Sequence, residues 1–155
     1  MHNKFHLFGF LIKLFLLGII FGGCDDAGSG GSGSISPLRD EPLILDSVLA
    51  INVSDDRPDG IADTFFDTSD RIYLWIFWVN VKGRHTVEVN WFSPEDAIDA
   101  PPFREDQETF TSSTGDQITW FYIDAPSGGF PDGEWFVEIF LDGLFERSHV
   151  FDVRR

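Results

Sequence analysis

Residues 131–153 read PDGEWFVEIFLDGLFERSHVFDV, and this stretch decides the fold. One row of its side chains consists of Trp135, Val137, Ile139 and Leu141, and the opposite row of Phe136, Glu138 and Phe140. Alternation with a period of two predicts a β-strand that turns its more apolar row toward a core. Asp142-Gly143 separates this pattern from a second one, which is a strong signal for a tight hairpin. The stretch therefore predicts two neighbouring antiparallel strands.

The same period continues upstream, and no stretch of ten or more residues has the pattern of an amphipathic helix. Pro-Asp-Gly occurs at residues 58–60 and again at residues 131–133, a combination that favours a type I turn closed by glycine. About seven short strands at this spacing predict an all-β fold, an antiparallel sandwich. We expect the strands at residues 43–53, 71–81, 85–92, 108–113, 117–124, 134–141 and 145–153.

Two stretches resemble parts of bacterial immunoglobulin-like domains. Residues 131–153 are similar to the last two strands of these domains, where a Gly-x-aromatic start leads to an Asp-Gly hairpin and a closing Phe-x-Val. Residues 70–96, DRIYLWIFWVNVKGRHTVEVNWFSPED, look like their central hairpin. The resemblance implies an immunoglobulin-like β-sandwich over residues 42–155, and it implies a fold more than a function.

The first 23 residues differ from the rest of the chain. Lys4 and Lys13 are their only charged side chains, and the apolar run LFLLGIIFG at residues 14–22 ends in small residues. This pattern predicts a cleaved signal peptide over residues 1–23, because the run is too short to span a bilayer as a stable helix. The alternative is a transmembrane anchor that is retained.

Cys24 is the only cysteine, so the chain has no intramolecular disulfide framework and no cysteine-based zinc site. The residues FGGC, 21–24, resemble the lipobox of bacterial lipoproteins. The resemblance implies that Cys24 is acylated, becomes the mature N-terminus and anchors the protein to a membrane of the bacterial cell envelope, on the extracytoplasmic side. Residues 24–41 then form a Gly/Ser-rich tether. The inner and the outer membrane both remain open.

Charge excludes one class of partner. The chain has 26 acidic and 11 basic residues and a net charge of -15. A surface this acidic repels nucleic acid along any long contact, so we expect no nucleic acid partner.

The acidic segment DDRPDGIADTFFD, residues 55–67, resembles the calcium loops of dockerins, EF-hands and thrombospondin type 3 repeats. Gly60 stands at the tight turn of that pattern. The possible calcium ligands are Asp55, Asp59, Asp63 and Asp67. The alternative, which we favour in so acidic a chain, is an acidic turn between two strands. We expect no other cofactor.

Aromatic residues are abundant, with 17 Phe and 5 Trp. If Trp135 faces the core, Phe136 and Phe140 lie outside, and one of two rows in residues 71–79 must also face outward. The candidate partner face consists of Tyr73, Trp75, Phe77, Phe136 and Phe140. An outer aromatic face is covered either by other parts of the chain, such as the N-terminal segment or long loops, or by a partner.

Catalytic motifs are missing. The sequence has no G-x-S-x-G, no H-E-x-x-H and no phosphate loop that follows a strand. His85 and His149 have no second His, Cys or acid at metal-binding spacing, so we interpret them as structural or surface residues. We therefore expect a non-catalytic domain that mediates contact with an envelope protein. The alternatives are a carbohydrate-binding surface module, calcium-dependent if the acidic segment binds the ion, and a small hydrolase.

We predict that Cys24→Ser abolishes acylation, because serine offers no thiol for the diacylglyceryl group. The variant accumulates as an uncleaved precursor without palmitate, measured by metabolic labelling of cells that express the full chain. Palmitate labelling at the wild-type level would contradict the lipoprotein hypothesis.

Overall fold

The computed structural model describes residues 41–96 and 100–155. These residues form strands and turns, and they include no helix of the length and hydrophobicity needed to cross a membrane. The predicted signal peptide, Cys24 and almost all of the tether lie outside the described residues.

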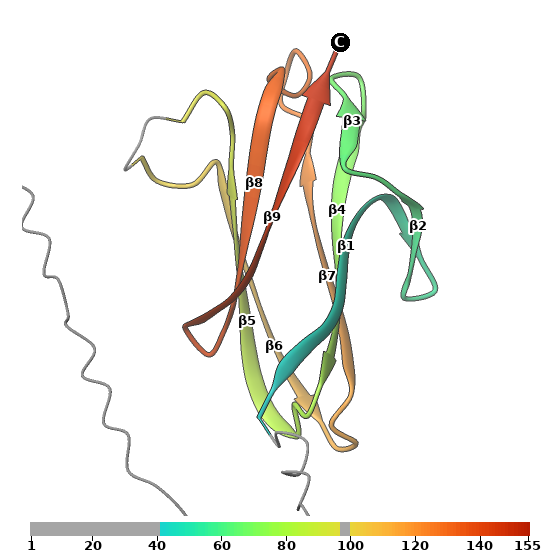
Figure 1. Ribbon diagram of the computed structural model, residues 1–155, viewed down its shortest axis with the longest axis vertical. Coiled ribbons are helices and arrows are strands. Elements are labelled where there is room, and N and C mark those ends of the chain that lie inside the picture. The colour runs from blue at the N-terminus through green and yellow to red at the C-terminus, as the bar shows by residue number, and fades with distance from the viewer. Residues whose placement is uncertain (1–40, 97–99) are drawn as a thin grey trace, which may run out of the picture. The chain divides into compact units, whose positions relative to one another are not determined.

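Within residues 41–96 and 100–155, nine strands form two sheets (Figure 1). The strands are β1 (Leu43–Ser54), β2 (Arg57–Ile61), β3 (Thr64–Phe66), β4 (Arg71–Val79), β5 (Gly83–Phe92), β6 (Arg104–Ser112), β7 (Gln117–Asp124), β8 (Gly133–Leu141) and β9 (Leu144–Arg154). One sheet has the strand order β2-β1-β4-β7 and the other β3-β9-β8-β5-β6. All pairs are antiparallel except β3 with β9, which run parallel. The predicted all-β sandwich is confirmed.

The seven expected strands correspond to β1 and to β4 through β9, although β6 begins at Arg104, four residues earlier than expected. The two additional strands come from the acidic segment. Asp55 and Asp56 form a two-residue hairpin turn. Both have positive φ, which a type I′ turn requires at its two central residues. Pro58 therefore lies inside β2, where it pairs with Val53 of β1. The type I turn predicted at residues 58–60 is wrong, because the chain has already turned before it reaches them.

The predicted alternation is confirmed in the strands that line the core. Trp135, Val137 and Ile139 of β8 are fully buried, and so is the row Leu74, Ile76 and Trp78 of β4. The hairpin predicted at Asp142-Gly143 joins β8 to β9, with positive φ at both residues.

Two of the fully buried indoles donate to acceptors close by, whereas the buried Nε1 of Trp91 has no hydrogen-bond partner among the described residues. Trp78 donates its Nε1–H to Thr119 Oγ1 at 2.9 Å, in a site where Trp78 is fully buried and Thr119 nearly so. Trp135 donates to the Pro131 carbonyl, also at 2.9 Å. These bonds fix the indoles inside an apolar core, since an unpaired buried donor is costly. The Trp78 bond joins β4 to β7 within their sheet.

We predict that Thr119→Val lowers the free energy of unfolding by about 1–3 kcal/mol, because valine keeps the shape and leaves the Trp78 donor unpaired. The matched control is Thr109→Val, which removes an exposed hydroxyl that contacts Thr86 and costs less than about 0.5 kcal/mol. Urea unfolding of both variants measures the difference. Equal losses in the two variants would show that the buried bond contributes nothing.

Candidate binding surface

The outer face of the β2-β1-β4-β7 sheet carries a continuous aromatic face. Register places Tyr73 opposite Tyr122 and Trp75 opposite Trp120 on neighbouring strands. We define the aromatic face as Tyr73, Trp75 and Phe77 of β4 with Ile118, Trp120 and Tyr122 of β7. It exists because β4 is apolar on both sides, and only one side can face the core.

The rings of this face contact one another at an angle. The Tyr73 ring lies 5.6 Å from that of Tyr122 and 6.2 Å from that of Trp120, with interplanar angles of 42° and 52°. Trp120 and Tyr122 are closer to parallel, at 27°. Trp120 is 40% exposed, the highest value for any tryptophan of the chain. The arrangement is a broad, uneven aromatic patch and not a single flat platform.

The hairpin of β1 and β2 covers one part of the aromatic face. Trp75 donates its Nε1–H to the Asp56 carbonyl at 2.7 Å, and Asp56 lies at the tip of that hairpin. Only 9% of Trp75 is exposed as a result. The hairpin stands at the side of the sandwich in Figure 1. Trp75 therefore lies on the predicted outer face, but the chain itself shields it from a partner.

A polar hollow of about 640 Å³ adjoins Tyr73 at one end of the aromatic face. Its lining includes Asn52, Asp70 and the ion pair in which Arg71 Nε donates to Asp124 at 2.6 Å. The Arg71 guanidinium also lies 4.4 Å from the centre of the Tyr122 ring. Hydrogen bonds to Tyr73 and Asp124 raise the pKa of Arg71 above its ordinary value, so the side chain stays charged.

A second hollow of about 240 Å³ lies at the opposite end of the aromatic face. It is lined by Phe77 and Ile118 together with the acidic residues Asp56 and Asp116. Carboxylates thus stand at both ends of an aromatic surface, and Arg71, the base that lines the first hollow, is paired with Asp124.

The remaining two residues of the predicted partner face lie elsewhere. Phe136 and Phe140 belong to β8, on the outer side of the second sheet. Phe136 is 39% exposed and stacks on Phe92 at 4.3 Å, whereas Phe140 contacts Phe145 at 5.7 Å. The five predicted residues are therefore divided between two opposite faces of the sandwich and do not form one surface.

The four aspartates predicted as possible calcium ligands follow the chain through separate elements. Asp55 lies in the hairpin turn, Asp59 in β2, Asp63 between β2 and β3, and Asp67 just after β3. Within residues 41–96 and 100–155, no three side chains of the His, Cys, Asp or Glu type come together in a group that could hold a metal ion. The structure does not bring these aspartates to one point.

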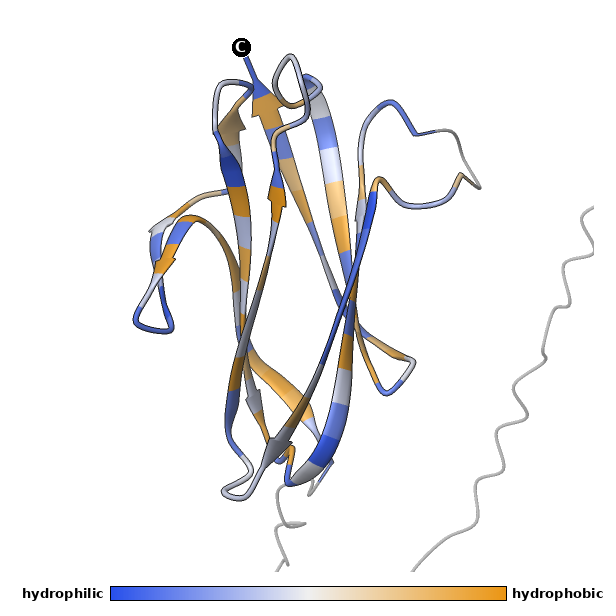
Figure 2. Ribbon diagram, turned by 180° about the vertical axis from the view of Figure 1, so that it is seen from behind, coloured by the Kyte–Doolittle hydropathy of each residue, from blue (hydrophilic) through white to orange (hydrophobic). Residues whose placement is uncertain are grey.

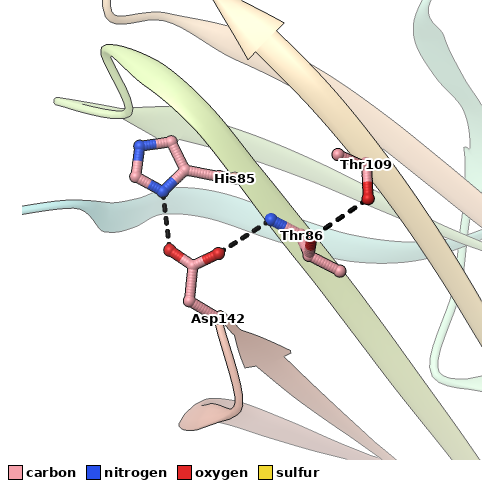
Figure 3. A network of polar contacts seen from close by, with 4 residues as sticks. All are labelled: His85, Thr86, Thr109 and Asp142. Carbon is pink, nitrogen blue, oxygen red and sulfur yellow. Dashed lines mark hydrogen bonds and ion pairs between the residues drawn. The ribbon is translucent and has the colours of Figure 1, made fainter.

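His85 has a partner that the sequence did not indicate (Figure 3). Its Nδ1 lies 2.7 Å from Asp142 Oδ2, and Asp142 Oδ1 accepts the Thr86 N–H at 2.8 Å. Burial raises the pKa of Asp142, but the bonds from Thr86 and His85 outweigh it and lower the pKa below its ordinary value. The cluster ties the β8–β9 hairpin to the beginning of β5, which is a structural role.

His149 also has a partner, and it is far away in sequence. Its Nε2 lies 2.7 Å from Ser47 Oγ, while Arg147 donates to the same Oγ at 3.1 Å and to the Ile44 carbonyl at 3.2 Å. A serine beside a histidine resembles a nucleophile with its base. Ser47 is only 5% exposed, however, and Arg147 holds the hydroxyl in place. The cluster joins β1 of one sheet to β9 of the other.

We predict that His149 makes stability depend on pH. Burial first, and then the Arg147 charge, lower its pKa below the ordinary 6.5, against the opposing effect of Asp46. The unfolded chain therefore binds more protons, so the free energy of unfolding falls as the pH drops through 6.5 toward the folded value. His149→Gln keeps an acceptor for Ser47 and removes this loss, which urea unfolding between about pH 5 and 8 measures. Parallel curves for wild type and variant would contradict the prediction.

Comparison of the sequence with protein families finds no family that matches, and comparison with curated proteins finds no match either.

Solved structures show the fold. An immunoglobulin-like protein from Pseudomonas aeruginosa aligns with a TM-score of 0.51 and 12% identity, covering 74% of this chain and 97% of that one. The alkylpurine DNA glycosylase AlkC of Pseudomonas fluorescens, bound to DNA with an abasic site analog, aligns with a TM-score of 0.50 and 13% identity. The match covers 74% of this chain and 31% of the glycosylase chain. The sandwich is an immunoglobulin-like fold.

Proposed function

We propose that this chain is a lipid-anchored protein of the bacterial cell envelope whose immunoglobulin-like domain is non-catalytic and binds another protein. The aromatic face of β4 and β7 is the binding surface. The observation that carries the proposal is Trp120, which is 40% exposed and lies beside Tyr73, tilted by 52°, and Tyr122, closer to parallel at 27°. Tryptophan, tyrosine and arginine are the residues that contribute most often to protein interfaces.

The anchor is the second part of the proposal. The FGGC motif at residues 21–24 supports acylation of Cys24, and the two or three acyl chains of a lipoprotein hold a protein more firmly than one chain does. The Gly/Ser-rich composition after Cys24 supports a tether with a typical span of roughly 20 Å. A domain held in this way meets its partner close to the membrane, on the extracytoplasmic side.

Carbohydrate binding is a second candidate, and the polar hollow beside Tyr73 favours it. Asn52, Asp70 and Arg71 surround this space next to an aromatic ring. Sugars bind where a ring offers a flat stacking surface close to polar side chains. The interplanar angles of 42° and 52° around Tyr73 make such a flat surface small, so the protein partner is preferred.

A photo-cross-linking amino acid at position 118 tests the proposal in envelopes of the native host, because Ile118 belongs to the aromatic face without being its central residue. We expect a discrete protein adduct from position 118 and none from position 136 on the other sheet. Trp120→Ala should weaken the adduct strongly, since truncation of a central interface tryptophan costs about 2 kcal/mol or more, roughly thirtyfold in affinity.

The matched control is Phe136→Ala. Phe136 is 39% exposed against 40% for Trp120, so both substitutions remove a similar exposed ring from opposite faces. Phe136→Ala should leave the adduct unchanged. Adducts that are lost equally in both variants, or a position-118 adduct that a soluble envelope glycan abolishes, would overturn the protein-binding proposal.

A further inference from the structure

We propose that the partner contributes an extended basic segment, which adds to the free edge of β7 as a further strand and lays its side chains on the aromatic face. The inference rests on the proposed function and names the partner's chemistry. It follows from the state of the sheet edges, from the side chains of β7 and from the charges around the aromatic face.

Within the described residues the two sheets end in β2 and β7 and in β3 and β6, but β2 and β3 are short, so residues 43–49 of β1 and 144–151 of β9 also lie at an edge. Side-chain bonds between Arg147 and Ile44 and between His149 and Ser47 link these two stretches to each other.

The strands β2, β3 and β6 carry features that discourage strand addition. β2 contains a proline and a positive-φ glycine, Pro58 and Gly60. β3 has only three residues. β6 begins with the run Arg104 to Glu108, REDQE, in which four of five residues are charged. Proline, short length and charge are the usual means by which proteins protect open edges.

β7 has neither a proline nor a charged run, and its one charged residue is Asp124 at its end. Its eight residues, QITWFYID, contain no proline, no lysine and no glycine, and among the described residues it pairs only with β4. Figure 2 shows the contrast, with β6 mostly hydrophilic and β7 largely pale or hydrophobic. An open edge of this kind presents unpaired N–H and C=O groups to an incoming strand.

A strand added at β7 would bring its side chains to the aromatic face. Side chains alternate along a strand, so every second residue of the incoming segment lies on the same side as Trp120 and Tyr122. Main-chain hydrogen bonds then supply affinity, and contacts of every second side chain with the aromatic face supply specificity. The hairpin tip at Asp56 closes the β1 side of this face, which leaves the β7 side open.

Charge identifies the segment as basic. Asp70 and Asp124 stand at one end of the aromatic face, and Asp56 and Asp116 at the other. Arg71, the one base that lines these two hollows, is held by Asp124, and Arg57 follows Asp56 at the hairpin tip. Lysine and arginine side chains can bind carboxylates at the ends and lie over aromatic rings between them. Asp116 and Asp124 are eight residues apart, so the matching strand is about eight or nine residues, roughly 27 Å.

Two other occupants fit the charges poorly. A second copy of this chain brings a net charge of -15 toward a face that is already acidic at both ends. The chain's own residues 24–40 contain three aspartates and one arginine, and their large apolar side chains are only Ile35 and Leu38. Both occupants lack the positive charge that the carboxylates would attract.

The test uses the full-length chain in detergent micelles and a fluorescent nine-residue peptide that alternates Lys with Thr. We expect binding by fluorescence anisotropy that weakens as salt is raised, and no binding of a matched Glu/Thr peptide. Two further Lys/Thr peptides carry backbone N-methyl groups on every second residue. One peptide is methylated at the odd positions and the other at the even positions, and we call these the two phases. Strand addition uses the N–H groups on one side only, so one phase should lose at least tenfold in affinity and the other less than twofold.

Protein variants locate the site. Trp120→Ala should lose about tenfold or more in peptide affinity, whereas Phe136→Ala should bind as wild type does. Asp116→Asn should lose a few-fold at low salt and less at high salt. Strand addition by a basic segment would be overturned if both N-methyl peptides lost affinity or if neither did. Binding of the Glu/Thr peptide as tight as that of the Lys/Thr peptide would overturn it too.

Two more measurements separate this inference from its alternatives. Sedimentation that shows a dimer of the chain, lost in Trp120→Ala, would assign the β7 edge to a second copy and overturn the basic segment. If the Lys/Thr peptide does not bind while the position-118 cross-link still forms, the result contradicts strand addition and supports the proposed protein-binding function. If the peptide binds with the expected dependence on the N-methyl phase but no envelope protein cross-links at position 118, the result supports strand addition at β7 and contradicts the proposed function.

Discussion

The structure depends on one constraint: β4 is apolar on both faces, and a two-sheet sandwich has only one interior. The row with Leu74, Ile76 and Trp78 fills that interior and is fully buried. The other row must lie outside, where burial of large aromatic side chains can still contribute if something covers them. The tip of the β1–β2 hairpin covers Trp75 of that row, and the outer rings of β7 contact Tyr73.

Polar groups connect elements that the hydrophobic pattern alone would leave loosely placed. The Trp75–Asp56 bond holds the β1–β2 hairpin against the outer face, and the Asp142 carboxylate holds the β8–β9 hairpin against β5. Ser47 and His149 link the two sheets. The Trp75 and Ser47 contacts are partly buried, so they also avoid the cost of leaving a desolvated polar group without a partner, whereas the Asp142 contacts are exposed.

Local patterns predicted the strands well because a period of two is written into adjacent residues. Trp135 and Val137 of β8 are buried where the alternation placed them. The acidic segment was predicted less well. Asp55-Asp56 is an uncommon sequence for a turn with two positive φ angles, and the nearby Pro-Asp-Gly is a much stronger local turn signal.

The candidate site was predicted only in part. Alternation placed Tyr73, Trp75 and Phe77 in one row, but it could not show that a distant hairpin covers Trp75 or that β7 continues the face. The partner of His149 is 102 residues away, and the one of His85 is 57 residues away. Contacts of that kind depend on how strands are ordered in the sheets, which no local spacing encodes.

The distribution of the tryptophans has an optical consequence. All five lie in the described residues, and four of them are at most 9% exposed, whereas Trp120 is 40% exposed. A water-soluble collisional quencher would therefore reach mainly one indole, and its emission would be the one that responds to the polarity just outside β7. The protein carries an intrinsic fluorophore at the centre of its aromatic face, so occupancy of that surface can be followed by light without attaching a label.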